Sequence, residues 1–364
     1  MILDKWLRGE ITEMTDIENK ENRRINLPFY KKISKFLFRR FTMQKKALII
    51  GNNHYDNFAS LNGCIADADE VARLLETNED ESVNFEVQKM TNIATKEILM
   101  QKIKQLFSGD SDIALFYFSG HGATLDGDEY ICTADSNRTI PGVKTSDILS
   151  LANKSNCKNK IIILDSCHSG GMGHTSLVLS ADLIGKGVTI LTSSLDTQAS
   201  MEIDGRGLFT VLLCEALKGG AADLFGKISP GSVYSFIDKA LGSWQQRPVF
   251  KTNVKEFISL RDVKAPIDIL KLKQITRLFK TPTENFALDP SFEFTNEAYN
   301  PDAVKPYAKK KNIEIFQTLQ KFERVGLVVP VDEEFMYFAA MHSKSCKLTP
   351  LGQYYWLLAD RKRF

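Results

Sequence analysis

The stretch IIILDSCHSGG at residues 161–171 runs from four apolar residues directly into an acid, a serine, a cysteine, a histidine and a pair of glycines. A short apolar run bounded by polar residues and glycine predicts a buried strand. Cys167 by itself is better explained as a packing residue, since free cysteine is among the residue types most often buried. The acid, serine, histidine and glycines beside Cys167 reverse that expectation and favour reactive chemistry at the end of the strand.

Five apolar runs of this kind alternate with helical patterns along the chain. Strands that alternate with helices predict an α/β fold, with a mostly parallel central sheet flanked by helices. In such sheets the active site lies beyond the carboxyl ends of the strands, where the connecting loops emerge. The apolar runs lie at residues 47–51, 84–90, 112–119, 160–165 and 188–193, and the helical patterns lie near 63–77, 94–108, 144–153 and 205–219.

The chain divides by composition into four regions. Residues 1–44 form a basic arm whose apolar residues recur at helical spacing; we expect it to dock on the main domain or to act as a regulatory or membrane-surface segment. The α/β domain covers residues 45–262. Residues 263–311 are rich in Pro, Asn and acid and predict a linker or irregular connection. A small α+β domain follows at residues 312–364.

This last region predicts a winged helix. An apolar stripe typical of a helix ends at Gly326, and two apolar runs at 327–331 and 335–341 flank three acidic residues as a hairpin. Thr349 is placed to cap a final helix with Pro350 at its first position. Helix, hairpin and helix in this order are the pattern of a winged-helix-like domain.

Composition and net charge restrict the cellular compartment of the protein and the kinds of partner that it can attract. The formal net charge is only +2, so no strong whole-molecule field draws the protein to nucleic acid or to a membrane. The N-terminus lacks the apolar core of a signal peptide, and no apolar run approaches the roughly 18 residues of a membrane span. The six cysteines include no CxxC pair. We therefore expect a cytoplasmic protein.

A second loop resembles the one at Cys167, because the run at 112–119 ends in Gly120-His121-Gly122. A cysteine paired with a histidine from another loop is the arrangement of a nucleophile and its base. His121 is a better partner than His168, since neighbouring side chains in extended backbone point to opposite faces. His54 and His174 show no comparable reason to face Cys167. Zinc needs three or four ligands, which these residues do not supply, so we expect no metal site.

The motifs taken together resemble the caspase-like cysteine peptidases, clan CD and peptidase family C14, in particular their prokaryotic, metacaspase-like branch. The resemblance implies the caspase-hemoglobinase fold, with Cys167 and His121 as the catalytic dyad. It also implies that the backbone N–H groups of Gly122 and Cys167 form the oxyanion hole. The residues that carry it are ALIIGNNHYDNFASLNGCIADADEVARLL at 47–75, FYFSGHG at 116–122, IILDSCHSGG at 162–171, ILTSSLDTQASME at 190–202 and GLFTVLLCEAL at 207–217.

The resemblance also implies what the enzyme cuts. In metacaspases the acid of Asp-Ser-Cys, here Asp165, faces the first substrate pocket together with the acid of a Gly-Cys-x-x-Asp segment, here Asp67. Ser119 and Cys64 match pocket-lining positions. Two carboxylates at the pocket floor would pair with a guanidinium or ammonium group, which predicts cleavage after Arg or Lys. Without the resemblance, Asp67 would be assigned to an exposed helix surface.

One departure concerns calcium. Calcium-activated metacaspases carry acids downstream of the catalytic residues, whereas His174 falls where one such acid is expected. No cofactor is expected, and calcium stays open as a candidate whose usual acidic ligands are not evident. Basic residues that are candidates for self-cleavage are Arg23, Arg24, Arg39, Arg40 and Lys186.

The sequence thus predicts a regulated cysteine endopeptidase. Its partners would be a protein substrate with Arg or Lys at the cleavage site and a regulator, or autoinhibition through residues 1–44 or 312–364. Family members in bacteria act in defence or programmed cell death, in some cases by cutting a pore-forming effector. The alternative is a winged-helix nucleic-acid-binding protein or a scaffold whose caspase-like domain is silent; the intact dyad argues against the scaffold, and the acidic wing tip at 332–334 argues against DNA.

Overall fold

The structure is a computed structural model that describes residues 43–167, 184–193, 202–203, 206–242, 248–254 and 256–364. The chain divides into two units, Met1–Gln44 and Lys45–Phe364. The predicted N-terminal arm therefore lies almost entirely outside the described residues.

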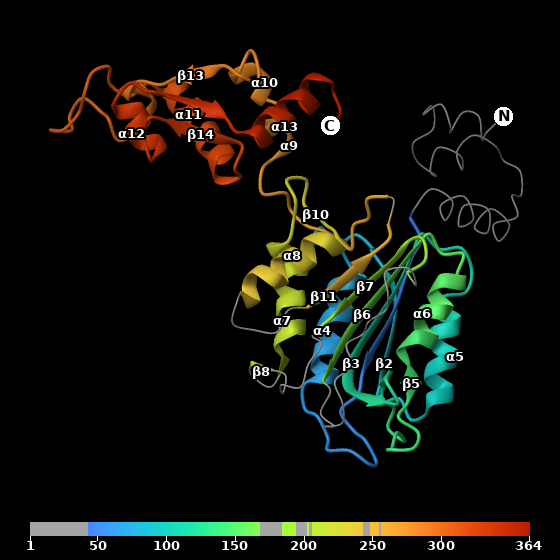
Figure 1. The fold of residues 1–364 in the computed structure, drawn as a ribbon. Coiled ribbons are helices and arrows are strands. Elements are labelled where there is room, and N and C mark those ends of the chain that lie inside the picture. The colour runs from blue at the N-terminus through green and yellow to red at the C-terminus, as the bar shows by residue number, and fades with distance from the viewer. Residues whose placement is uncertain (1–42, 168–183, 194–201, 204–205, 243–247, 255) are drawn as a thin grey trace, which may run out of the picture. The chain divides into compact units, whose positions relative to one another are not determined.

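The centre of the α/β domain is an eight-stranded sheet, six strands of which follow the order β11-β7-β6-β3-β1-β2 (Figure 1). Among these six, all neighbouring strands are parallel except for β11, which pairs antiparallel with β7. The predicted mostly parallel sheet is therefore confirmed, and each predicted apolar run forms a strand. The six strands are β1 (Lys45–Gly51), β2 (Glu86–Thr91), β3 (Ile113–Leu125), β6 (Asn159–Cys167), β7 (Val188–Thr192) and β11 (Val249–Thr252).

Helices cover both faces of this sheet, which is why its central strands are apolar on both sides. Side chains alternate along β3: Tyr117 packs in the layer under α4, α7 and α8, whereas Phe118 packs in the layer under α5 and α6 (Figure 1). Both side chains are fully buried. The helices are α4 (Cys64–Glu76), α5 (Lys96–Leu106), α6 (Thr145–Lys154), α7 (Leu208–Glu215), which continues into a π-helical segment at Ala216–Gly220, and α8 (Pro230–Leu241).

Helix α4 begins against the carboxyl end of β1. A Cβ atom added to Gly51 would lie 2.3 Å from the carbonyl oxygen of Cys64, so only glycine allows this approach. The contact fixes the first turn of α4, which carries Cys64 and Asp67, beside the carboxyl edge of the sheet.

Several short strand pairs extend the α/β domain. At the carboxyl edge, β3 runs beyond its parallel neighbours and pairs antiparallel with β4 (Asp128–Ile131), which pairs with β5 (Val143–Lys144). Two further antiparallel pairs join β8 (Glu202–Ile203) to β9 (Arg206–Gly207) and β10 (Lys227–Ile228) to β12 (Arg261–Asp262).

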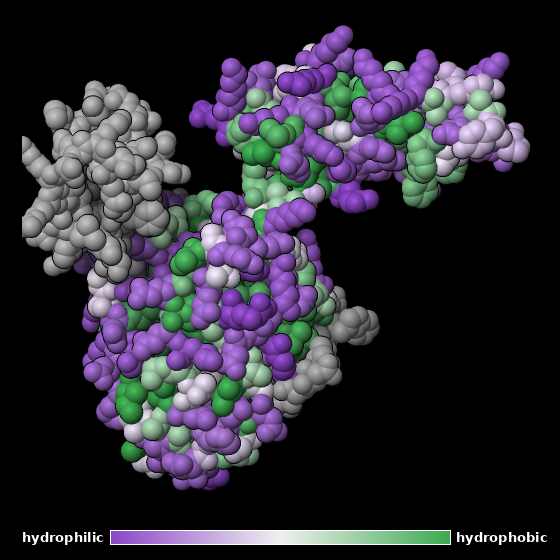
Figure 2. Space-filling view, turned by 180° about the vertical axis from the view of Figure 1, so that it is seen from behind, coloured by the Kyte–Doolittle hydropathy of each residue, from purple (hydrophilic) through white to green (hydrophobic). Residues whose placement is uncertain are grey.

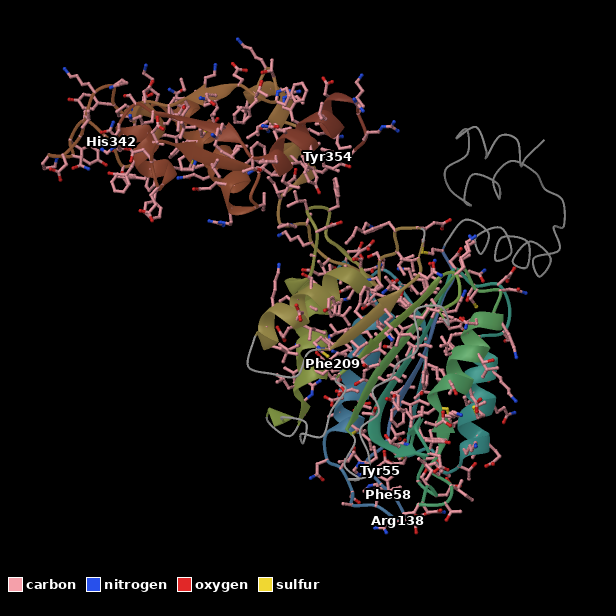
Figure 3. All side chains as sticks on the ribbon, viewed as in Figure 1. Tyr55, Phe58, Arg138, Phe209, His342 and Tyr354 are labelled. Atoms are coloured by element: carbon pink, nitrogen blue, oxygen red, sulfur yellow. The ribbon has the colours of Figure 1, made fainter. Side chains whose placement is uncertain are left out.

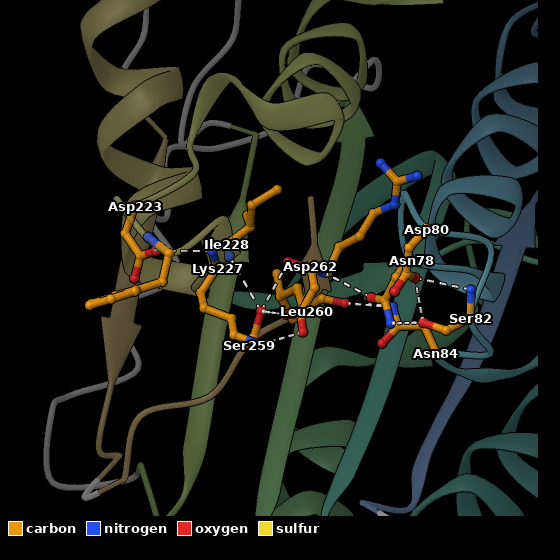
Figure 4. Close-up of polar contacts among 12 residues, drawn as sticks. Asn78, Asp80, Ser82, Asn84, Asp223, Lys227, Ile228, Ser259, Leu260 and Asp262 are labelled. Carbon is orange, nitrogen blue, oxygen red and sulfur yellow. Dashed lines mark hydrogen bonds and ion pairs between the residues drawn. The ribbon is translucent and has the colours of Figure 1, made fainter. Parts of the chain in front are cut away.

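Polar contacts fasten β12 to the loop after α4 (Figure 4). The Asp262 N–H donates to Asn78 Oδ1 over 2.9 Å, and the Ser259 hydroxyl donates to Asp262 Oδ1 over 2.8 Å. Lys227 forms an ion pair with Asp262. The end of the α/β domain is thus tied back to its first helix.

The remaining residues form a second core, centred on Phe279, Phe316 and Phe322. Its three-stranded sheet has the order β13-β15-β14 and is antiparallel. Its elements are α9 (Ile269–Leu272), α10 (Ile275–Leu278), β13 (Asn285–Ala287), a 3-10 turn (Pro290–Phe292), α11 (Lys310–Arg324), β14 (Val328–Val331), α12 (Met336–Met341), β15 (Ser345–Leu348) and α13 (Pro350–Asp360).

The prediction for residues 263–311 is a linker or an irregular connection, and the linker half of this prediction is wrong: Leu272, Ile275 and Phe279 are buried in the second core and β13 pairs with β15. The Pro, Asn and acidic residues between these apolar positions conceal them in the sequence. The short elements of this segment are joined by irregular backbone.

The predicted winged-helix hairpin is also wrong, because residues 335–341 contain helix α12 and not a strand. Met336, Ala339 and Ala340 are buried at helical spacing, and alanine favours helix. The strand that pairs with β14 is β15, further along the chain. The capping of α13 is confirmed, since Gly352 N–H donates to the Thr349 hydroxyl over 3.0 Å.

Replacing Gly51 with alanine tests the contact between β1 and α4. The added Cβ would displace the backbone of Cys64, so we expect Gly51→Ala to lower the free energy of unfolding by about 1–3 kcal/mol in urea denaturation. Gly231→Ala is the matched control: it lies in helix α8, its nearest contact would be 3.9 Å away, and it should be neutral or stabilising. Equal losses in both variants would contradict this account.

Candidate active site

His121 lies where β3 passes the end of β1, and its side chain is 5% exposed. Its ring packs against Tyr55 and Phe58, at centroid distances of 4.7 and 6.0 Å; both come from the loop after β1 (Figure 3). Its Nε2 atom lies 2.7 Å from the carbonyl oxygen of Ala59. A carbonyl only accepts hydrogen bonds, so Nε2 carries the proton of the neutral ring and Nδ1 is the basic nitrogen.

The backbone of His121 is held as firmly as its ring. Its N–H donates to the Tyr55 hydroxyl over 2.8 Å, and that hydroxyl donates to the carbonyl of Asn52 over 3.3 Å. A Cβ atom at Gly120 would lie 2.4 Å from the Tyr55 hydroxyl oxygen. Gly120 is thus the residue that lets Tyr55 reach the backbone of His121.

The predicted oxyanion donor Gly122 follows on the same strand. His121 directs its N–H to Tyr55 and its carbonyl to the N–H of Cys132, which is 2.9 Å away and continues β4. Successive backbone groups along a strand point to opposite sides, and Gly122 pairs with Ile131 without exchanging hydrogen bonds. The N–H of Gly122 therefore points away from β4, toward the side of β3 on which β6 pairs.

Cys167 is the last residue of β6 and stands in register with His121 on the adjacent parallel strand. Parallel strands in a sheet lie about 4.8 Å apart. In the same ladder, two positions before the pair of His121 and Cys167, Ser119 stands in register with Asp165. The side chain of Cys167 lies outside the described residues, as do His168 and His174.

The other cysteines are buried. Burial raises the pKa of Cys132 and of Cys346 to about 12, and that of Cys214 to about 11, so these thiols stay protonated near neutral pH. Cys157 precedes β6 at the opposite end of that strand from His121, with its sulfur 3.1 Å from the hydroxyl of Ser111. Cys132, Cys214 and Cys346 are therefore poor candidates for a nucleophilic thiolate, and Cys157 lies too far from the carboxyl end of β6 to pair with His121.

Behind the His121 position lie two buried carboxylates, Asp165 and Asp67, which are 5% and 1% exposed. Asp165 accepts a hydrogen bond from the Thr210 hydroxyl over 2.6 Å. Asp67 accepts from Arg206 Nε over 2.8 Å and from the N–H of Gly207 over 3.2 Å. Without the family resemblance, Asp67 would be assigned to an exposed helix surface. That assignment is wrong, because Asp67 is buried.

The two carboxylates converge on Gly207. A Cβ atom added there would lie 2.8 Å from Asp165 Oδ2 and 3.4 Å from Asp67 Oδ2. Burial, opposed by the hydrogen bond from Thr210 and reinforced by the charge of Asp67, raises the pKa of Asp165 to about 6. An acidic cluster of this kind attracts a cationic group and repels an anionic one.

The remaining predicted residues divide between this cluster and the protein surface. Ser119 is buried beside Asp165 on the neighbouring strand, and Cys64 is buried at the first turn of α4. His54 is exposed, and its backbone N–H donates to Asn92. Lys186, predicted as a self-cleavage site, is exposed, and its carbonyl accepts from Lys160 over 2.8 Å.

Sequence reasoning missed five residues that build the site: Tyr55, Ala59, Arg206, Gly207 and Thr210. Ala59 acts through its carbonyl, which no residue type signals. Gly207 and Thr210 lie in GLFTVLLCEAL at 207–217, a stretch that carries the family resemblance but assigns no role to either residue.

The described residues contain no group of three or more His, Cys, Asp or Glu side chains arranged to hold a metal ion. Among the helices of this same part of the chain, none has the length and apolarity needed to cross a membrane.

Comparison with known proteins gives consistent matches. The family model described as Caspase domain, of peptidase family C14, matches residues 44–284. Metacaspase-8 of Arabidopsis thaliana is 31% identical over 148 residues, which are 36% of this chain and 38% of that protein. Metacaspase-1 of Yarrowia lipolytica is 32% identical over 146 residues, which are 35% of this chain and 32% of that protein. The matched parts thus span about a third of the length of these relatives.

Among solved structures, caspase-1 from Spodoptera frugiperda aligns with 18% sequence identity and a TM-score of 0.46, over 62% of this chain and 94% of that one. The family model covers more than half of the chain, and the chain therefore belongs to the caspase-domain family. The family model confirms the predicted family and, for the α/β domain, the caspase-like fold; the prokaryotic branch stays a prediction.

The burial of Asp165 predicts a pH-dependent stability. Its folded pKa of about 6 lies above that of an exposed aspartate, so between about pH 4 and 6 the unfolded chain has released a proton that the folded protein retains. The contribution of Asp165 to the free energy of unfolding thus falls as the pH rises through this window, by about 2–3 kcal/mol in total.

Asp165→Asn removes this contribution, so its unfolding free energy relative to the natural protein should rise by that amount between pH 4 and pH 7 in urea titrations. Asp126→Asn is the control, because Asp126 is exposed in a turn. A constant difference between Asp165→Asn and the natural protein across this range would show that Asp165 is not buried as described.

Proposed function

We propose that this protein is a cysteine endopeptidase that cleaves peptide bonds after Arg or Lys, with Cys167 as nucleophile and His121 as its base. The observation that carries the proposal is the ladder between β3 and β6, in which His121 faces Cys167 and Ser119 faces Asp165. The same ladder thus supports both the reacting pair and the acidic cluster that would select the substrate.

The chemistry follows from the proton positions at His121. Its Nε2–H is directed to Ala59, so Nδ1 takes the proton from the Cys167 sulfur. The thiolate attacks the carbonyl carbon of the scissile bond, and the resulting oxyanion accepts hydrogen bonds from the N–H groups of Gly122 and Cys167. The C–N bond breaks as His121 gives its proton to the leaving amine.

A water molecule then hydrolyses the thioester. His121 takes a proton from the water, which attacks the acyl carbon, and returns the proton to the sulfur as the C–S bond breaks. The acid product leaves and the enzyme is restored. Burial of His121 and its ring contacts with Tyr55 and Phe58 hold the imidazole in one orientation throughout.

Substrate choice rests on the two carboxylates. A guanidinium or ammonium group that reaches Gly207 meets an oxygen of Asp165 and an oxygen of Asp67. An acidic side chain there would face two like charges, which would cost several kcal/mol. The predicted pocket residues Ser119 and Cys64 border the same region.

The wider role extends the proposal by resemblance. We place the protein in the cytoplasm as a regulated protease of bacterial defence or programmed cell death, with a pore-forming effector as a candidate substrate. The hairpin on which the nucleic-acid alternative rested is not present at residues 327–341, because α12 occupies the place of its second strand.

A protein-interaction or autoinhibitory role for the C-terminal region is better supported. Several large apolar side chains are exposed there, and Figure 2 shows apolar areas among the charged ones on its visible face. These side chains are Phe335, Tyr337, Phe338, Leu351, Tyr354 and Leu357.

A peptide panel tests the proposed reaction. The natural protein should cut after Arg and Lys but not after Asp, Cys167→Ala should be inactive, and His121→Ala should lose about 10²–10⁴-fold in kcat. Cys157→Ala is the matched control, since this cysteine lies at the other end of β6, and its activity should be unchanged. Cleavage by the Cys167→Ala protein at the natural rate would refute the assignment.

Gly207→Ala tests the substrate pocket. Its Cβ would stand 2.8 Å from Asp165 Oδ2, so kcat/KM for Arg and Lys peptides should fall at least about tenfold, while the rate of Cys167 alkylation by iodoacetamide stays the same. Gly231→Ala should change neither quantity. Parallel losses in turnover and alkylation would mean that residue 207 supports the fold and not the pocket.

A further inference from the structure

Asp67 already holds a guanidinium group, that of Arg206. The ion pair joins Arg206 Nε to Asp67 Oδ1 over 2.8 Å, and it links two residues 139 positions apart in the sequence. This is the kind of group that the proposed pocket would receive from a substrate. The pocket therefore contains a cation of its own.

Arg206 is the more exposed partner of this ion pair. The Arg206 side chain is 27% exposed, whereas that of Asp67 is 2% exposed. The second oxygen of Asp67 accepts from the N–H of Gly207, at the point where the two carboxylates converge. A substrate cation that pairs with Asp67 must take the place of the Arg206 guanidinium or share the carboxylate with it.

The contacts of Arg206 are weak enough for another cation to replace its guanidinium on Asp67. A two-nitrogen fork on one carboxylate is the strongest form of an arginine ion pair. Here Nε contacts Asp67, while Nη2 points to the sulfur of Cys214 at 3.8 Å, a weak acceptor. The Arg206 guanidinium is thus held through one nitrogen on Asp67 and is open to solvent on one side.

We propose that Arg206 is the resident cation of the substrate pocket and determines its specificity: it occupies Asp67 in the resting protein and competes with the basic side chain of the substrate. This inference rests on the proposed function for its meaning in catalysis. It predicts that the pocket binds basic groups more weakly than its two acids alone would allow. A structural counter-ion, by contrast, would stabilise α4 against β9 without competing with any ligand.

Complementation with a soluble guanidinium distinguishes these roles. The probe is agmatine, a butylamine with a guanidinium group, added to proteins that also carry Cys167→Ala so that no cleavage occurs. Removing Arg206 takes the guanidinium partner away from a buried carboxylate, which destabilises the protein. We expect Arg206→Ala to bind agmatine at least about tenfold more tightly than the protein with Arg206, with a Tm increase that grows with agmatine concentration.

Three variants control this experiment. Asp67→Asn/Arg206→Ala should lose the gain in agmatine binding, because the carboxylate is gone. Arg73→Ala should show no gain, because Arg73 pairs with Glu70 on the exposed side of the same helix. Arg206→Lys retains the charge but lacks the Nε–H; it should show an intermediate gain, and it serves if Arg206→Ala does not fold.

Agmatine binding that is no tighter in both Arg206→Ala and Arg206→Lys, or that is equally tight in the double variant, would overturn the proposal. With Cys167 present, Arg206→Ala should lower KM for an Arg peptide at least about fivefold and leave iodoacetamide alkylation unchanged.

The two proposals fail separately. If no protein cuts Arg or Lys peptides but the agmatine result holds, the peptidase proposal fails and Arg206 is still the resident cation. If peptides are cut and agmatine shows no preference, only the role of Arg206 is lost.

Discussion

Hydrogen bonds between the parallel strands β3 and β6 fix which residues emerge together at the carboxyl edge of the sheet. Their ladder runs from Ile113 opposite Asn159 to His121 opposite Cys167. A slip of one residue would exchange the two faces of a strand, and both faces here are buried. Tyr117 and Phe118 pack in opposite layers, so neither can change sides without exposing or overpacking a core. The hydrophobic layers thereby set the spacing of the polar groups beyond them.

The acidic cluster depends on compensation of its buried charge. A carboxylate removed from water is stable only with hydrogen bonds or an opposite charge. Asp165 has the Thr210 hydroxyl and Asp67 has the Arg206 guanidinium with the Gly207 N–H. The partners come from β9 and α7, whereas the carboxylates come from α4 and β6. Formation of the cluster therefore requires the segment 206–210 to be in place, which would couple the proposed substrate recognition to that part of the chain.

Much of the α/β domain could be predicted from the sequence, because its strands are continuous apolar runs and its helices have clear periodicity. The C-terminal region was harder to predict. Phe335 to Met341 has the aromatic content of a strand, but Met336, Ala339 and Ala340 give it a helical buried face. At the site, His121 stands out by its glycines, whereas Ala59 contributes only a backbone oxygen and Arg206 pairs with an acid 139 residues away. Such long-range contacts leave no local pattern.

We propose that the β3–β6 register brings His121 and Cys167 together beside a pocket for basic side chains. The most direct measurement is mass-spectrometric mapping of the adduct formed with an arginyl chloromethyl ketone peptide, in the natural protein and in His121→Ala. We predict a single adduct on Cys167, formed far more slowly in the variant and competed by agmatine. An adduct on one of the buried cysteines, or labelling of Cys167 that is unaffected by both His121→Ala and agmatine, would contradict the account.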